Sequence, residues 1–395
     1  MKTFNFANWE RRDLAENTLT GGGLVYEDIQ TVVHGGETVF SLSNRKAVGH
    51  RVKFVEAFED AAKGNEYRIT MRVKLGDSCT SDRAAIVVGV SDPFALTPAF
   101  LSAPAEATKD AWTIIEFTHV LAEDIHSSVS VEQFKGDKLV AEEILVAEVK
   151  TELLHRAEAV KGEEDTRKTL WLIGDSITCD YSSSVTTRGW GMFIGEWFDD
   201  SKIKVNNRAR AGFSTRSFVK TDGLAIWSYV CRRMKAGDYL IVSLGINDHS
   251  SSSLFRRTSV EEYAENLAIF ADEAHKRGVS LILVTPTVTV ENDPVSNYRR
   301  VRAEAMLGVA AEKKAAGYDI TALDLNAHMM AFIEETVDKK GRDYLINTYF
   351  SAAKKADGSI AFDTTHHREA GSRKVASMIV ELLDASDCSL REFRK

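Results

Sequence analysis

A chain of 395 residues in which 44% of the side chains are hydrophobic can bury two cores, so we expect two globular domains. A formal charge of -8 excludes a general binder of nucleic acid or anionic membranes, because phosphate-rich partners need a concentrated basic face. No run approaches the roughly eighteen apolar residues of a membrane span and no secretory leader opens the sequence, which predicts a cytoplasmic protein, or a secreted one if a leader preceded it.

The first 160 residues predict an all-β sandwich domain. Apolar side chains alternate or form short runs at 67–73, 84–90, 112–117 and 128–132, the period-two pattern of strands bounded by turn residues. No strong helical segment separates these runs, as expected of two antiparallel sheets.

A charged, apolar-poor stretch at 161–168 predicts a linker, which gives domains of 1–160 and 161–395. In the second domain, short apolar runs alternate with segments of helical spacing, and Ser259 with Glu262 forms a capping box at one helix start. The runs lie at 169–173, 202–205, 239–244, 281–285 and 320–325, and the helical segments at 259–276, 297–314 and 369–385. This alternation predicts a three-layer α/β/α domain with a parallel sheet, in which ligands bind beyond the carboxyl ends of the strands.

The first candidate for chemistry is Ser176, within Gly174-Asp175-Ser176-Ile177 after an apolar strand. A serine that leaves a strand and enters a helix exposes its hydroxyl at the mouth of the sheet and places backbone N–H groups near a developing oxyanion. The alternative is that Asp175 and Ser176 only cap the next helix.

The second candidate is Asp363-Thr364-Thr365-His366, just before a helix expected from about Glu369. Three-residue spacing around a turn lets the carboxylate reach Nδ1 of the imidazole while Nε2 faces outward, as a general base requires. The alternative is a surface turn with an incidental histidine. His367 is one step off this pattern, so its side chain should point elsewhere.

Two further candidates could complete an oxyanion hole. Asn247 follows the strand predicted at 239–244, where its amide could donate to a tetrahedral oxyanion, and Gly212 could bring a backbone N–H to the same place. An ordinary turn at either position is the alternative.

The order Ser, Gly, Asn, Asp-x-x-His resembles the SGNH (GDSL-like) hydrolase superfamily, whose named residues would be Ser176, Gly212, Asn247 and His366. The resemblance implies a flavodoxin-like sheet and a serine esterase that forms an acyl-enzyme, with Asp363 orienting His366 and the Ser176 N–H completing the oxyanion hole. No metal or organic cofactor is expected.

Within that superfamily the chain looks most like the rhamnogalacturonan acetylesterases. The similarity lies in 174–176, 189–191, 207–218 and 363–366 followed by Gly371, and it runs from about Thr169 to the C-terminus. It implies an acetylated saccharide substrate. Ile177 and Ile246 stand where that family often has Thr and His, which leaves the glycan open.

Three residues are candidate substrate contacts: Asp175, Trp190 and Arg216. Arg216 could hold a sugar carboxylate, with an exposed or salt-bridged arginine as the alternative. The N-terminal strands resemble galactose-binding-like sandwiches, although packing or an oligomer interface is an equally open role. A lipase or thioesterase acting on longer acyl chains, or a non-catalytic carbohydrate-binding protein, remains a rival prediction.

Overall fold

The computed structural model describes residues 1–4, 6, 14–17, 29–45, 48, 51–54, 57–58, 61–91, 98–122, 128–134, 138–157, 166–181, 186–220, 224–250, 256–291, 295, 297–354 and 360–395. Two compact units divide after Glu163, except that Leu224–Ile226 group with the first unit. Residues 161–165 of the linker predicted at 161–168 lie outside the described residues. Among the described residues, no helix combines the length and apolar character needed to cross a bilayer.

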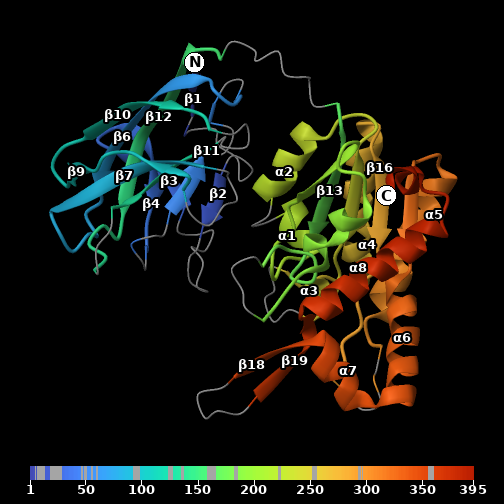
Figure 1. Cartoon of the computed structure of the whole chain (residues 1–395). Coiled ribbons are helices and arrows are strands. Elements are labelled where there is room, and N and C mark those ends of the chain that lie inside the picture. The colour runs from blue at the N-terminus through green and yellow to red at the C-terminus, as the bar shows by residue number, and fades with distance from the viewer. Residues whose placement is uncertain are drawn as a thin grey trace. The chain divides into compact units, whose positions relative to one another are not determined.

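The first unit is an antiparallel β-sandwich, as the alternation predicted (Figure 1). One sheet has the order β10-β6-β12-β4-β3 with β1 beside β12, and the other has β2-β5-β11-β7-β8 with β9 beside β7. The strands are β1 (Lys2–Thr3), β2 (Leu14–Asn17), β3 (Ile29–His34), β4 (Glu37–Leu42), β5 (Arg51–Phe54), β6 (Glu66–Leu75), β7 (Arg83–Ser91), β8 (Phe100–Leu101), β9 (Ala105–Thr108), β10 (Thr113–Val120), β11 (Ser128–Gln133) and β12 (Ile144–His155).

Alternating burial creates the core between these sheets. Every second side chain of β6 from Tyr67 to Leu75 is buried, and these side chains join one hydrophobic cluster with Phe54 of β5 and Val88 of β7. Packing of the inner faces of two sheets is the defining contact of a sandwich.

The second unit is built on five parallel strands in the order β14-β13-β15-β16-β17. Numbered along the chain within this unit, that order is 2-1-3-4-5, the flavodoxin-like arrangement that was predicted. The strands are β13 (Lys168–Gly174), β14 (Ile203–Asn207), β15 (Tyr239–Ser243), β16 (Ser280–Val284) and β17 (Ile320–Leu323).

Helices cover both faces of this sheet (Figure 1). Tyr239 and Ile241 of β15 pack in a cluster with α6 and α8, whereas α4 and α5 contact β16 from the other side. The helices are α1 (Thr215–Lys220), α2 (Leu224–Arg233), α3 (Ile246–Ser250), α4 (Val260–Lys276), α5 (Arg300–Ala315), α6 (Leu325–Lys340), α7 (Arg342–Tyr349) and α8 (Glu369–Asp384), with short 3-10 turns η3 (Trp190–Met192), η4 (Ile194–Trp197) and η5 (Ser389–Phe393).

An antiparallel hairpin of β18 (Phe350–Lys354) and β19 (Ile360–His367) precedes α8. It extends from the end of the unit where the parallel strands finish (Figure 1). The sequence predicted only a turn before α8. In the structure, Asp363 and His366 lie on strand β19 instead.

Candidate active site

The segment after β13 forms a single tight turn that carries Ser176. The backbone N–H groups of Thr178 and Cys179 donate to the carbonyl of Asp175 at 3.1 and 3.0 Å. The sequence predicted that a helix would begin here, and this was wrong, because the hydrogen-bonded turn ends after Cys179 and the next α-helix among the described residues begins at Thr215.

The turn stops because other groups take its next carbonyls. The carbonyl of Ile177 accepts from the Trp190 N–H at 2.8 Å, and that of Thr178 accepts from the Asn207 side-chain amide at 2.9 Å. A helix would need both carbonyls for its own ladder. Trp190, a candidate substrate contact, therefore supports the turn through its backbone, and its side chain is fully buried in the core.

Asp175 lies beneath the turn. Its side chain is buried and accepts a hydrogen bond from the Ile177 N–H at 2.9 Å. Burial raises the pKa of Asp175 to about 7, and the hydrogen bond from Ile177 opposes that rise. This position favours a structural role beneath Ser176 over the substrate contact for which the sequence made it a candidate.

A bulge of three unpaired residues in the hairpin carries His366. Phe350 pairs with His367 while the next residue, Ser351, pairs with Asp363, so one step on β18 matches four steps on β19. Residues 364–366 are therefore displaced from the ladder, and a bulge of this kind redirects a side chain away from the sheet.

The Asp363 carboxylate holds both the bulge and the imidazole. Its Oδ1 accepts from the backbone N–H groups of Thr365 and His366, both at 2.9 Å, and its Oδ2 lies 2.6 Å from Nδ1 of His366. The opposite ring nitrogen, Nε2, lies 2.8 Å from Oγ of Ser176. The structure thus brings together three residues that the sequence predicted, from opposite ends of this unit.

These contacts determine the tautomer of the imidazole. Partial burial would raise the pKa of Asp363, but the hydrogen bonds from the His366 side chain and the two backbone N–H groups outweigh it and hold the pKa well below its usual range. An ionised carboxylate only accepts, so Nδ1 of His366 donates to it. The lone pair of Nε2 is then directed at the Ser176 hydroxyl.

His367 points away from this centre, as its spacing predicted. Its ring is buried against Phe350, with ring centroids 5.0 Å apart. Burial lowers the pKa of His367 to about 3, and the neighbouring His366 adds to the effect.

Gly212 and Asn247 follow the two strands that flank β13. The ladder between β13 and β14 continues past the strands, since the Arg210 N–H donates to the Gly174 carbonyl at 2.9 Å. The Asn247 amide donates to the Phe213 carbonyl at 2.9 Å, which ties the end of β15 to the same loop. The three predicted oxyanion donors therefore follow three neighbouring strands.

Donor groups remain available in these loops. Within the described part of the chain, the backbone N–H groups of Ser176 and Gly212 have no acceptor, and neither does the second amide hydrogen of Asn247. Gly212 has φ of +79°, a backbone conformation that favours glycine. A Cβ there would approach only the guanidinium of Arg256, the end of a flexible side chain, so the backbone rather than the space requires glycine.

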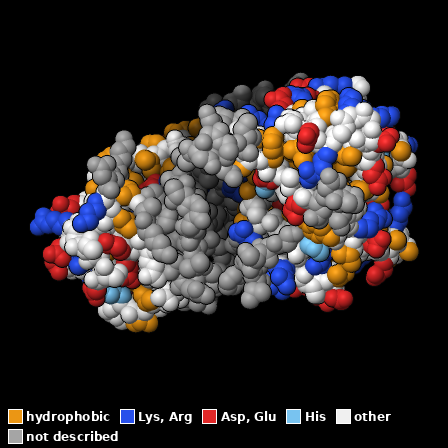
Figure 2. Space-filling view, turned by 90° about the horizontal axis from the view of Figure 1, so that it is seen from below, with side chains coloured by type: hydrophobic (Ala, Val, Ile, Leu, Met, Phe, Trp, Pro, Cys, Tyr) orange, Lys and Arg blue, Asp and Glu red, His pale blue; other side chains and the backbone are white. Residues whose placement is uncertain are grey.

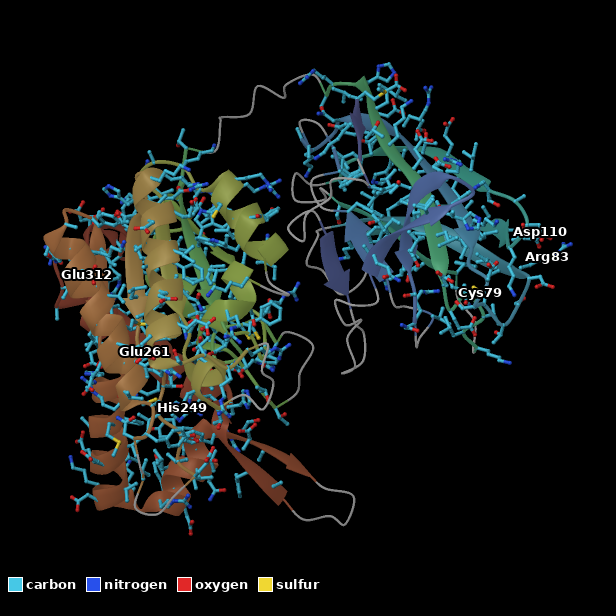
Figure 3. The ribbon with its side chains drawn as sticks, turned by 180° about the vertical axis from the view of Figure 1, so that it is seen from behind. Cys79, Arg83, Asp110, His249, Glu261 and Glu312 are labelled. Atoms are coloured by element: carbon cyan, nitrogen blue, oxygen red, sulfur yellow. The ribbon has the colours of Figure 1, made fainter. Side chains whose placement is uncertain are left out.

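Asp248, which follows the candidate Asn247 directly, is a buried carboxylate to which the sequence assigned no role of its own. It accepts from the Thr215 N–H at 3.0 Å, the Thr215 hydroxyl at 2.5 Å and the Thr258 hydroxyl at 3.2 Å. Burial raises its pKa to about 6, against the hydrogen bonds from Thr215. It fastens the start of α1 to α3, whose His249 lies at the hairpin end of the unit (Figure 3).

Arg216 is occupied within the protein. Its Nε donates to Glu262 at 2.7 Å and its Nη2 forms an ion pair with the same carboxylate. This supports the salt-bridged alternative for Arg216. It also leaves the capping box half formed, because Ser259 accepts from the Glu262 N–H at 3.1 Å while the Glu262 side chain faces Arg216.

Seen from the hairpin end, the described surface of the second unit carries interspersed acidic and basic side chains (Figure 2). The side chains of Asp363 and His366 are 45% and 30% exposed, so the base is open to solvent from its own face. Across the described ranges, no group of three or more His, Cys, Asp or Glu residues could hold a metal ion.

A family model described as GDSL-like Lipase/Acylhydrolase family matches residues 172–373. A curated relative, the uncharacterized esterase YxiM of Bacillus subtilis strain 168, is 29% identical over 227 residues, which is 55% of this chain. The chain spans about half, 52%, of the length of that relative.

Two solved structures are similar to this chain at low identity. The YXIM protein of Bacillus subtilis has a TM-score of 0.47 and 18% identity, covering 96% of this chain and 92% of that chain. A catalytic mutant of Axe2, an acetylxylan esterase from Geobacillus stearothermophilus, has a TM-score of 0.40 and 16% identity, covering 56% and 95%.

Proposed function

This chain belongs to the GDSL-like Lipase/Acylhydrolase family, and from that premise we propose that it is a serine esterase. Ser176 is the nucleophile, His366 the general base and Asp363 the acid that orients it. The observation that carries this proposal is the continuous contact from Asp363 Oδ2 through the His366 ring to Ser176 Oγ, at 2.6 and 2.8 Å.

The reaction begins when Ser176 Oγ attacks the ester carbonyl and its proton passes to Nε2 of His366. Asp363 stabilises the imidazolium, since its carboxylate already accepts from Nδ1. The oxyanion accepts hydrogen bonds from the Ser176 and Gly212 backbone N–H groups and from the second amide hydrogen of Asn247.

Collapse of the tetrahedral intermediate expels the alcohol, which takes the proton from His366, and leaves an acyl group on Ser176. A water molecule then attacks the acyl carbonyl while His366 accepts its proton. The acid product departs, and the proton returns to Ser176. These steps use only side chains, backbone groups and water.

The proposed substrate class is an acetylated saccharide, such as a pectin-derived or xylan-derived chain. The support is the sequence similarity to rhamnogalacturonan acetylesterases in 189–191 and 207–218. Release of acetate from acetylated pectins, xylans and small acetylated sugars tests it. Preference for octanoyl esters would favour a lipase or thioesterase instead, and glycan binding without hydrolysis would favour a binding protein.

Replacement of the nucleophile tests the esterase itself. Ser176→Ala is expected to lower kcat by at least about ten-thousandfold on any ester that the wild type hydrolyses, because no other group can form the acyl-enzyme. Ser201→Ala, a change at an exposed serine in the same unit, is the matched control and should keep wild-type turnover. Wild-type kcat in the Ser176→Ala protein would refute the scheme.

A further inference from the structure

We propose that Thr289 is a positioning residue whose buried hydroxyl fixes the bulge that carries His366. The inference deepens the proposed function, on which it rests, because it explains how an imidazole on a hairpin is held against a serine on the central sheet. Thr289 lies outside every motif discussed so far.

The segment that contains Thr289 continues from β16 along the buried side of the hairpin. Thr287, Val288, Thr289 and Val290 are each 2% exposed or less, although the segment forms no helix or strand. Irregular backbone this deeply buried needs hydrogen-bond partners, and part of the bulge supplies them.

Two donors from this segment converge on one carbonyl of the bulge. The Thr364 carbonyl accepts from the Thr289 hydroxyl at 2.9 Å and from the Val290 N–H at 3.1 Å. Thr289 Oγ1 also lies 3.2 Å from the Thr365 hydroxyl. The Thr289 hydroxyl has one proton and two acceptors within reach, the Thr364 carbonyl at 2.9 Å and Oε1 of Glu291 at 3.3 Å. We assign the proton to the shorter bond, so Thr289 donates to the Thr364 carbonyl and accepts from the Thr365 hydroxyl.

These bonds differ in kind from those that Asp363 makes. Asp363 belongs to β19 and moves with the bulge, so its bonds shape the bulge without fixing its place. Thr289 and Val290 instead follow β16, a strand of the parallel sheet that also carries Ser176 at the end of β13. Their bonds to Thr364 therefore fix His366 relative to the nucleophile.

The distance from His366 Nε2 to Ser176 Oγ depends on this attachment. Thr364 is two residues from His366, and the residue between them, Thr365, lies outside the ladder. Loss of the Thr289 hydroxyl leaves the Val290 N–H as the remaining described donor to Thr364, whereas His367 stays attached because its carbonyl accepts from the Arg188 N–H at 2.9 Å. The bulge can then pivot about His367. Small displacements of a catalytic base lower the rate steeply, by up to about a hundredfold per ångström.

Three single substitutions test the role of the hydroxyl. Thr289→Val keeps the shape and removes the hydroxyl, and Thr289→Ser keeps the hydroxyl. Thr287→Val is the matched control, since Thr287 is equally buried in the same segment but its hydroxyl has no partner among the described residues. Each full-length protein is assayed for kcat and KM and for the rate at which a fluorophosphonate labels Ser176.

Thr289→Val is expected to lower kcat and the labelling rate together by about tenfold, with KM within about twofold, since the base is displaced and the binding surface is not. Thr289→Ser should restore both rates to within about threefold, and Thr287→Val should match the wild type. Thr365→Val, which removes the second hydroxyl of the pair, should lower kcat less and should not add to Thr289→Val. It serves as the test if Thr289→Val does not fold.

Wild-type kcat and labelling in Thr289→Val would overturn the proposal. Equal losses in Thr289→Val and Thr287→Val would also overturn it, because the cause would then be packing. Wild-type kcat in Thr365→Val would do the same if Thr289→Val cannot be folded. A wild-type protein that the fluorophosphonate does not label at Ser176 would instead refute the proposed function, and this inference with it.

Discussion

The two oxygens of Asp363 have separable roles. Oδ1 closes the bulge through two backbone N–H groups, and Oδ2 receives Nδ1 of His366. A substitution that keeps an acceptor at Oδ1 but changes the group at Oδ2 therefore affects the chemistry and spares the backbone.

Asp363→Asn is expected to lower kcat by about a hundredfold to ten-thousandfold with little change in melting temperature. The amide nitrogen facing Nδ1 would force the proton onto Nε2 of His366, where it blocks acceptance from Ser176. Asp363→Ala should lose the bulge bonds as well and be about 1 kcal/mol less stable than Asp363→Asn. Equal stability of the two variants would contradict this division of roles.

Asp175 gives the protein a pH-dependent stability. Its pKa is near 7 in the folded protein and near 3.8 in the unfolded chain, so between these pH values the folded state binds more protons. Its contribution is fully present below about pH 4 and is lost as the pH rises through about 7. Asp175→Asn removes that dependence.

The expected result is that Asp175→Asn gains stability relative to the wild type as the pH rises. Urea unfolding at pH 5 and pH 8 measures it, as the difference in the free energy of unfolding between variant and wild type. A difference that is the same at both pH values would show that the carboxyl of Asp175 is ionised in the folded protein throughout.

The single residues that could be predicted from the sequence are those whose chemistry allows few residue types. Ser176, Asp363 and His366 were predicted because a nucleophile, a base and an acid come in few residue types. Thr289 was not predicted, because a buried threonine carries no spacing signal and its partners in the bulge, Thr364 and Thr365, are 75 and 76 residues away. Arg216 carried a misleading signal, since its partner Glu262 is distant in sequence.

Elements were predictable where periodicity decides them. The run at 67–73 became β6 and the helical spacing at 259–276 became α4, because alternating burial is written into the residues themselves. The helix expected after Ser176 failed because Trp190 and Asn207 take the carbonyls that would continue it. The bulge of β19 was not predicted either, because it arises from the register of β19 against β18 and not from the pattern of β19 alone.

The contact of α8 with the end of α7 and with β19 leaves no room for a side chain at Gly371. A Cβ there would lie 2.0 Å from the Tyr349 carbonyl and 3.0 Å from Cβ of His367. Gly371→Ala should therefore force α8 away from the end of α7 and from β19 and lower the free energy of unfolding by about 1 to 3 kcal/mol, with a fall in kcat as His366 shifts.

Gly308→Ala is the matched control, also within a helix. A Cβ at Gly308 meets nothing within 4 Å, so this variant should gain about 1 kcal/mol from helix propensity and keep its kcat. Urea unfolding and ester hydrolysis measure both variants. Equal effects of the two substitutions would mean that the close approach at Gly371 does not exist.

The described residues form two separate hydrophobic clusters, one in each unit. One includes Val88 and lies between the sheets of the sandwich, and the other includes Ile282 and lies against the parallel sheet. All the proposed catalytic groups belong to the second unit. Domains with their own cores can unfold as separate cooperative units.

Calorimetry of the full chain is therefore expected to show two unfolding transitions that respond to different substitutions. Val88→Ala should lower one melting temperature by several degrees, and Ile282→Ala should lower the other, because each leaves a cavity costing about 2 to 5 kcal/mol in its own core. Esterase activity should disappear with the transition that Ile282→Ala shifts. Val88→Ala should leave unchanged the temperature at which half of the activity is lost. A single transition lowered by both variants would mean that folding of the catalytic unit depends on the sandwich. In that case both substitutions would lower the temperature at which esterase activity is lost.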